Sequence, residues 1–388
     1  MYFTFSKEAV YGQDTTSQDY VLELVSEEII ENVNYSKIQE FNHPTSLARI
    51  PGINTVDGRC DFEITYGNDA WPVFFEVLLG QRVRIANVAF ARSYERWNII
   101  TGQLTAALNT TDTTFTITEY KDGEFDNVDG VIINSEYISI SSIADGAVSL
   151  SQRGQEGTTA ALHAANALVY GVVSSGGRNV DIISRYRDGY CYFLPESITA
   201  VVYRAGDYFK FNGIQFRDMV FKADPQNGVD LSADLIGRLG GPFDFASPSL
   251  TVDSNPMLDT DHFNVFSMGE HLGVLKMDIQ VSNTLNQGPA KILDTTYQAL
   301  VLRRFATYGQ FTAEEDTLEY YNAYKDNDAK NMSITACNGR GFTQAYVFAL
   351  NDIKWGTMQH VLRGTRLITD SIPFYCYGED SFTIMVQT

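Results

Sequence analysis

Alternating apolar and polar residues predict β-strands at many places along the chain. The clearest alternation runs from Arg59 to Tyr66, in the sequence RCDFEITY. A period of two is the pattern of a strand that has one buried and one solvated face. The sequence LKMDIQVS at 275–282 alternates in the same way. We expect further strands at 21–26, 178–186, 214–222, 229–235, 299–308, 332–337, 342–350 and 380–387.

A helix is predicted directly after the first of these strands. Its apolar residues recur at i, i+3, i+4 and i+7, which places them in one stripe along a helix. Asn68 or Asp69 can cap the first turn, and Gly80 ends the helix. We expect this helix to pack against a sheet through Trp71, Phe74, Phe75 and Leu78.

Residues 35–55 break all periodicity. This segment contains Pro44 and Pro51, and it forms either an ordinary long loop or a projecting arm. Loops longer than about 12–15 residues without structure of their own are usually functional or disordered. A second helix is predicted at 313–325, because Thr312 and Glu315 fit a capping box.

Residues 101–170 differ in character from the rest of the chain. They indicate short strands divided by Gly/Asp turns, and a Ser-Ser-Gly-Gly joint at 174–177 follows them. Such a pattern favours a small β module inserted into a larger domain. The predicted division is therefore a first core part, the module and a second core part, at 1–100, 101–173 and 174–388.

The overall pattern predicts a mainly β fold. Strands and helices do not alternate regularly, which argues against a parallel α/β sheet. The chain also contains 24 Phe and 22 Tyr, and aromatic residues favour pleated, half-buried surfaces. We expect two packed antiparallel sheets with a few peripheral helices.

The charge is strongly negative, with 28 Lys and Arg against 48 Asp and Glu and a net charge of −20. Tight coating of nucleic acid is not expected, because affinity for the phosphate backbone comes mainly from Lys and Arg. The acidity serves either general solubility or a surface that repels DNA.

Candidate catalytic and metal-binding patterns are not found in the sequence. The four cysteines lie far apart, and the five histidines have no second His or Cys at metal-ligand spacing. Neither a GxSxG elbow nor a phosphate-binding loop occurs. We expect no enzyme, no cofactor and no metal site. No signal peptide and no apolar run of about 20 residues are seen, so we expect a protein made in a reducing cytosol that does not enter membranes.

Two groups of arginines are candidates for ion pairs within or between subunits. The first follows the predicted helix and the second lies near the C-terminus. They are Arg82, Arg84, Arg92 and Arg96, and Arg303, Arg304, Arg363 and Arg366.

Ordered motifs in the first hundred residues resemble the tail tube (major tail) protein family of siphophages. They are KEAVYG at 7–12, LELVSEE at 22–28, DGRCDFEITYG at 57–67 and EVLLG at 76–80. The last 120 residues are similar to this family too, and the resemblance covers about two thirds of the chain.

The resemblance implies a tail-tube β-sandwich or barrel with a flanking α-helix. Six copies would form a hexameric ring, and stacked rings would form a virion tail tube that conducts genomic DNA during ejection. The implied partners are the chain itself and the tape measure, tail terminator and distal tail proteins, with DNA passing without specific binding. The subunit would be made in the bacterial host cytoplasm. The arm at 35–55 would contact the adjacent ring through Phe41, His43, Pro44, Leu47 and Ile50.

The segment 101–170 departs from that family. It is similar to a small β module of other phage structural proteins, and it would lie on the outer surface. Glu136, Arg153 and His163 are expected to form a polar cluster that shapes its turns, not a catalytic site. Alternative functions are another phage tail, baseplate or decoration protein, and a glycan-binding or depolymerase-like surface protein.

Overall fold

The computed structural model describes residues 1–388 apart from 14, 16–17, 33–34, 39–47, 52–53, 94–97, 120–122, 145, 186–195, 205, 225–227, 244–255, 259–262, 268–269, 273, 288–299, 315–318, 339–343, 358, 364–365 and 378–380. The protein is mainly β, with 69% strand and 5% helix, and its largest sheet is antiparallel. The mainly β prediction is confirmed. Each predicted strand range overlaps an observed strand.

One part of the large sheet, which we call the broad stretch, contains six strands. Neighbouring strands are antiparallel and hydrogen-bonded throughout. In spatial order they are β6 (Thr55–Glu63), β18 (Gly228–Gly237), β17 (Asp207–Asp224), β22 (Val274–Gln287), β23 (Leu300–Glu314) and β27 (Arg366–Cys376).

A second stretch lies across the core from the first. Its order is β20 (Phe263–Ser267), β24 (Lys330–Cys337), β25 (Ala345–Trp355), β28 (Phe382–Gln387), β15 (Leu168–Arg185) and β7 (Gly80–Phe90). Strand β25 also pairs with β27, which joins the two stretches. Residues of both belong to one buried apolar cluster, including Phe62, Met219, Ile279, Phe348 and Ile384.

Shorter strands extend the sheet at its margins. Strand β1 (Tyr2–Lys7) pairs with β2 (Tyr20–Glu27) and β16 (Ile198–Arg204), and β19 (Leu239–Phe243) pairs with β17. At the outer side of β6 lie the end of β2 and the short β3 (Ile30–Asn32). At the opposite end of the broad stretch, β26 (Gln359–Arg363) pairs with β27. Strand β21 (Glu270–Leu272) pairs with β20, and β8 (Arg92–Ser93) pairs with β9 (Asn98–Ile99).

Helix α1 (Ala70–Leu79) follows β6 as the sequence predicts. Asp69 is the N-cap residue, and the backbone amide of Ala70, the first residue of the helix, donates to Oδ1 of Asn68 at 2.9 Å. Gly80 ends the helix with a φ of 99°, a left-handed conformation that glycine adopts without a steric cost. Buried Asn283 of β22 donates to the carbonyls of Leu78 and Phe216, and thereby ties the end of the helix to the sheet.

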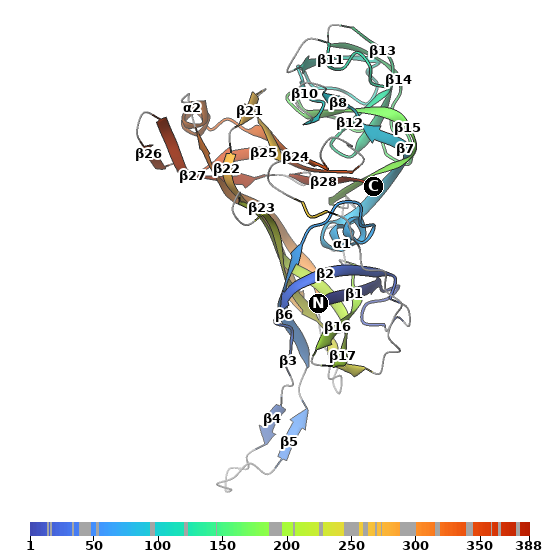
Figure 1. The fold of residues 1–388 in the computed structure, drawn as a ribbon, viewed down its shortest axis with the longest axis vertical. Helices are drawn as coiled ribbons and strands as arrows, with labels where there is room; N and C mark the ends of the chain where they lie inside the picture. The colour runs from blue at the N-terminus through green and yellow to red at the C-terminus, as the bar shows by residue number, and fades with distance from the viewer. Residues whose placement is uncertain are drawn as a thin grey trace.

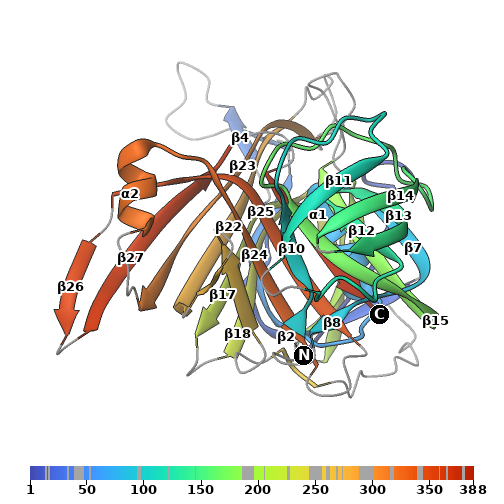
Figure 2. The same ribbon diagram turned by 90° about the horizontal axis from the view of Figure 1, so that it is seen from above.

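Six described strands close into a small barrel. Their circuit is β10 (Thr101–Leu104), β11 (Thr114–Glu119), β14 (Ala147–Gln152), β13 (Glu136–Ala144), β12 (Gly130–Ile133), the first part of β15, and β10 again. The interior is a separate apolar cluster that includes Leu104, Ile117, Phe125, Val131 and Ile138. The barrel lies at one side of the molecule and β26 and β27 lie at the other (Figure 2).

Two details of the sequence analysis are wrong. The expected flexible joint at 174–177 lies inside β15, which runs unbroken from the barrel into the second stretch. The Ser-Gly sequence instead forms an irregularity in the pairing with β7 between Ser174 and Asn179. The second helix, α2 (Glu319–Asp326), begins later than predicted. Thr312 lies in β23 opposite Lys276, so it caps no helix.

A two-stranded ribbon stands apart from the large sheet. Strands β4 (Tyr35–Ile38) and β5 (Ala48–Pro51) pair only with each other among the described strands. The ribbon lies at the opposite end of the molecule from the barrel (Figure 1). Part of the irregular segment 35–55 is thus a projecting β-ribbon. In a paired ribbon the two strands satisfy backbone hydrogen bonds that a loop would leave to water.

Candidate functional site

The outward face of the broad stretch is polar along its whole width. Its inward residues are buried, whereas the residues that alternate with them are partly exposed. The face carries the carboxylates Asp57, Asp61, Glu63, Asp218, Asp224, Asp230, Asp234 and Asp278. Among the described residues, the basic side chains on it are Arg59, Arg217, Lys222 and Lys276. Negative charge therefore predominates.

These carboxylates stand in rows across the strands. Glu63 of β6 lies opposite Asp230 of β18, and Asp230 lies opposite Lys222 of β17. Lys222 in turn lies opposite Asp278 of β22. Directly opposite residues in antiparallel strands are close enough to interact. The row therefore places two like charges side by side at one end, where they repel.

Burial and hydrogen bonds have opposite effects on two of these acids. Burial alone would raise the pKa of Asp61, but hydrogen bonds from Ser232, Ser26 and Arg59 outweigh burial and lower the pKa. The pKa of Asp234 is raised, first by burial, which Arg59 and Arg217 oppose, and further by the neighbouring carboxylates Asp218 and Asp61. At Asp234 the neighbouring carboxylates therefore add to the effect of burial on the pKa.

A groove of about 480 Å³ lies at the β23–β27 end of this face. Tyr308 and Tyr375 line it with nearly parallel rings, whose centroids are 6.5 Å apart. Tyr375 and Tyr377 are 49% and 57% exposed. The other lining residues are Ser282, Thr284, Phe305, Ala306, Thr307, Cys376 and Ser381. None of the described residues that line the groove is charged, so this part of the face differs sharply from the β6–β18–β17 part.

The predicted arm contacts fall mostly outside the described residues. This applies to Phe41, His43, Pro44 and Leu47. Ile50 lies in β5, opposite Ser36 of β4. The structure therefore places the arm as a ribbon and leaves its contacts as a prediction.

The four residues named for helix packing all lie in the core. Trp71 stacks on Phe75 with ring centroids 5.6 Å apart, and Phe74 lies 4.4 Å from the ring of Phe216 in β17. Leu78 is 3% exposed. Helix α1 is therefore held by an aromatic cluster that extends into the broad stretch.

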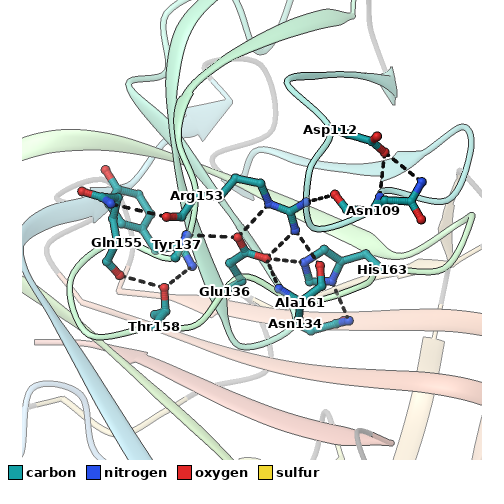
Figure 3. A network of polar contacts seen from close by, with 11 residues as sticks. Asn109, Asp112, Asn134, Glu136, Tyr137, Arg153, Gln155, Thr158, Ala161 and His163 are labelled. Carbon is teal, nitrogen blue, oxygen red and sulfur yellow. Dashed lines mark hydrogen bonds and ion pairs between the residues drawn. The ribbon is translucent and has the colours of Figure 1, made fainter.

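The barrel contains a buried ionic cluster, shown in Figure 3. Glu136, at the start of β13, has a fully buried side chain. Arg153 donates to it from Nε at 2.9 Å and from Nη2 at 2.6 Å. Nε2 of His163 lies 2.8 Å from Oε2 of the same carboxylate. The structure thus brings together the three residues that the sequence analysis grouped.

Backbone groups complete this cluster. The amides of Gly154 and Ala161 donate to Glu136, and Arg153 donates to the carbonyls of Asn109 and Ala161. Burial alone would raise the pKa of Glu136, but the bonds from His163, Arg153 and Ala161 outweigh burial and hold the pKa at about 2. The cluster fixes an irregular loop around one carboxylate. The side chains of Glu136, Arg153 and His163 are enclosed, being 0%, 8% and 1% exposed.

Sequence reasoning missed a second carboxylate with many partners, Glu8. Its oxygens accept hydrogen bonds from the amides of Gly12 and Gly213 and from the hydroxyls of Ser197 and Thr199, at 2.6–2.8 Å. These bonds tie the N-terminal segment to β16 and β17. The KEAVYG motif was the available signal, because it pairs the acid with a glycine whose φ of 68° suits a tight turn.

Two of the singled-out arginines are held within the subunit. Arg82 and Arg84 of β7 both contact buried Asp181 of β15, at 2.8 Å. Arg96 lies outside the described residues. The within-subunit interpretation therefore applies to Arg82 and Arg84.

In the described part of the chain, no three His, Cys, Asp or Glu side chains are grouped as metal ligands would be. None of the helices described there is long and apolar enough to cross a membrane. Comparisons with models of protein families and with curated proteins find no match for this chain.

Proposed function

We propose that this chain is a non-enzymatic subunit of a phage tail tube, which assembles into stacked rings around a DNA-conducting channel. The observation that carries the proposal is the wide acidic face of the broad stretch. In this arrangement the broad stretch and the second stretch are the two packed sheets of the sandwich, and the broad stretch faces the channel.

Repulsion explains why such a face suits a channel for DNA. A protein holds the phosphate backbone by neutralising it with Lys and Arg and releasing counterions. Here the carboxylates Asp61, Glu63, Asp230 and Asp234 predominate on β6 and β18. DNA that passes such a wall meets few cations that retain it, so it slides.

The position of the ribbon is an argument for the proposed stacking of rings. β4 and β5 extend away from the body (Figure 1), and among the described strands they pair only with each other. An isolated two-stranded ribbon is at best marginally stable in water. Contact with the adjacent ring would give the ribbon a surface to pack against. The closed barrel, whose strands have no free edge toward the ring, decorates the outside of the tube.

Electron microscopy of the purified chain and of the virion tests the proposal. We expect rings and tubes from the wild-type chain and a high copy number in virion tails. A variant in which a short Gly-Ser turn replaces residues 35–51 should form rings that do not stack. A persistently monomeric chain that is absent from virions would overturn the proposal.

The charge argument has its own test. Tubes carrying Glu63→Lys with Asp230→Lys should retain linear duplex DNA at low salt, whereas wild-type tubes should not. Glu156→Lys, an exposed acid on the barrel, is the matched control and should leave retention unchanged. Equal retention by both variants would show that this face does not line the channel.

A further inference from the structure

Two strands of the barrel carry apolar residues on both of their faces. In β12, Val131 and Ile133 belong to the cluster that fills the barrel, whereas Ile132 between them belongs to a different buried cluster. The first part of β15 alternates in the same way, with Val169 inside the barrel and Tyr170 in the other cluster. A short, continuous apolar run is typical of a strand that is buried on both sides. The barrel therefore has an apolar outer surface along β12 and β15.

Strand β11 differs from β12, although both belong to the same barrel. It lies half-way round the circuit of strands from β12. Its sequence alternates strictly: Thr114, Thr116 and Thr118 are exposed, and Ile117 is buried in the interior. Alternation with period two is the pattern of a strand with one solvated face. One side of the barrel thus suits water, and the side formed by β12 and β15 suits contact with protein.

The second stretch of the body provides the matching surface. In β25, Tyr346 and Phe348 belong to the cluster shared with the broad stretch, whereas Val347 and Ala349 belong to the cluster of Tyr170. Met385 of β28 lies opposite Val347 and belongs to the same cluster. We call it the docking cluster, and it includes Ile132, Tyr137, Tyr170, Val347, Ala349 and Met385. The barrel therefore covers the face of the second stretch that is turned away from the broad stretch.

Hydrogen bonds join the barrel to the body beside the docking cluster. The hydroxyl of Tyr170 donates to Oγ of Ser333 in β24 at 2.9 Å, and both side chains are fully buried. Nδ2 of Asn351 in β25 donates to Oδ1 of Asn134 at 3.3 Å. Nδ2 of Asn134 in turn contacts Nδ1 of His163, at 3.3 Å, so the ionic cluster of the barrel is continuous with this contact. Buried polar groups that lose such partners are costly to leave unpaired.

We infer that the outer face of the second stretch is an interaction surface whose partner is the barrel of the same chain. The barrel is then a required cover of the body and not a module that can be removed. Without it, Val347, Ala349 and Met385 would form part of a bare apolar sheet face, and such faces cause association. The inference goes beyond the proposed function and does not depend on the assembly of rings.

A pair of deletion chains tests whether the barrel is a cover. Gly102 of β10 and Val169 of β15 lie opposite each other in paired antiparallel strands, so a short Gly-Ser turn can replace residues 103–168. We expect the first deletion chain to lose most of its soluble fraction, as measured by low-speed centrifugation, because the outer face is bare. The second deletion chain also carries Val347→Thr, Ala349→Ser and Met385→Gln. It should stay soluble and give a circular dichroism spectrum of folded β protein.

The same three substitutions should have the opposite effect in the full-length chain, because there they place polar groups inside the docking cluster. A buried polar group without a partner costs enough to raise the rate of hydrogen exchange about tenfold or more. We expect this acceleration in β25, in β28 and in the barrel, as measured by mass spectrometry. The matched control is Val10→Thr with Ala86→Ser and Met257→Gln, which makes the same chemical changes at exposed positions. It should leave hydrogen exchange unchanged.

Three outcomes would overturn the inference. A first deletion chain that is soluble and folded would show that the outer face needs no cover. Equal precipitation of the two deletion chains would show that the apolar face is not the cause. Hydrogen exchange in the full-length triple variant at the level of its control would show that the barrel does not rest on this face. None of these measurements involves rings, so the inference and the tail tube proposal can fail independently.

Discussion

Removal of the buried carboxylate Glu136 should loosen the barrel without unfolding the body. The substitution Glu136→Gln removes the negative charge that holds Arg153, whose side chain is only 8% exposed. The pKa of Glu136 is about 2 against an ordinary value of 4.5. At about 1.4 kcal/mol per pH unit, this difference corresponds to about 3 kcal/mol. Breaking a buried ion pair by removing one partner costs a similar amount, about 3–5 kcal/mol.

Trypsin offers a direct measurement of this loss. Between residues 101 and 170 the only cleavage sites are Lys121 and Arg153, and Arg153 is held by the cluster. Cleavage of a protected site follows the population of the opened state when closing is faster than cutting. A loss of about 3 kcal/mol therefore predicts cleavage after Arg153 about 100-fold faster in Glu136→Gln than in wild type.

The control is Glu156→Gln, which makes the same charge change at an exposed position in the same loop. It should cleave at nearly the wild-type rate. If the two variants cleave at similar rates, or if Glu136→Gln is accelerated by less than about threefold, the cluster does not hold the loop and the reasoning above is wrong.

Three further predictions concern the ionisation of Glu136, the hydrogen bonds of Glu8 and two glycines. The pKa of Glu136 in the folded protein lies below its value in the unfolded chain. The stability that this carboxylate contributes is therefore complete above about pH 4.5 and is lost toward pH 2. Hydrogen exchange should show this loss of barrel stability in wild type and a smaller loss in Glu136→Gln. Glu8→Ala should lower the free energy of unfolding by about 2–4 kcal/mol, since four hydrogen bonds to a carboxylate are lost. Urea titration measures this loss, with Glu23→Ala as the control. Equal unfolding midpoints for the two variants would contradict the prediction. Gly58→Ala should cost about 2 kcal/mol, because its Cβ would lie 2.5 Å from the backbone carbonyl oxygen of Glu28. Gly228→Ala, with positive φ and open space around it, should cost only about 1 kcal/mol. Equal losses of stability in thermal unfolding would refute the difference.

Sequence patterns predicted the fold where local signals and burial agree. The predicted strand at Arg59–Tyr66, of which residues 59–63 lie in β6, repeats its apolar residues at every second position, and α1 repeats them at the helical period. Each element buries the face that this pattern predicts. Period-two alternation fails in the barrel, where all four residues of β12 are buried. A turn at Asn134, whose φ is 53°, separates β12 from β13.

Long-range contacts were harder to predict than elements. The cluster of Glu136, Arg153 and His163 was grouped through a resemblance, whereas Glu8 meets partners about 190 and 205 residues away along the chain. No local period encodes such pairs. The tyrosine groove likewise requires β22, β23 and β27 to lie side by side, and strand order is set by tertiary packing.

The unbroken strand β15 has a mechanical consequence for the barrel. Because this strand belongs to both the barrel and the body, no linker lies between them along this segment. A force that pulls the barrel along β15 acts in shear on the ladders to β7 and β28, which resist together. The barrel cannot swing free before those ladders fail. On the surface of a long filament, such barrels would be rigidly attached. A force applied to a barrel would be transmitted through β15 to the body of its subunit.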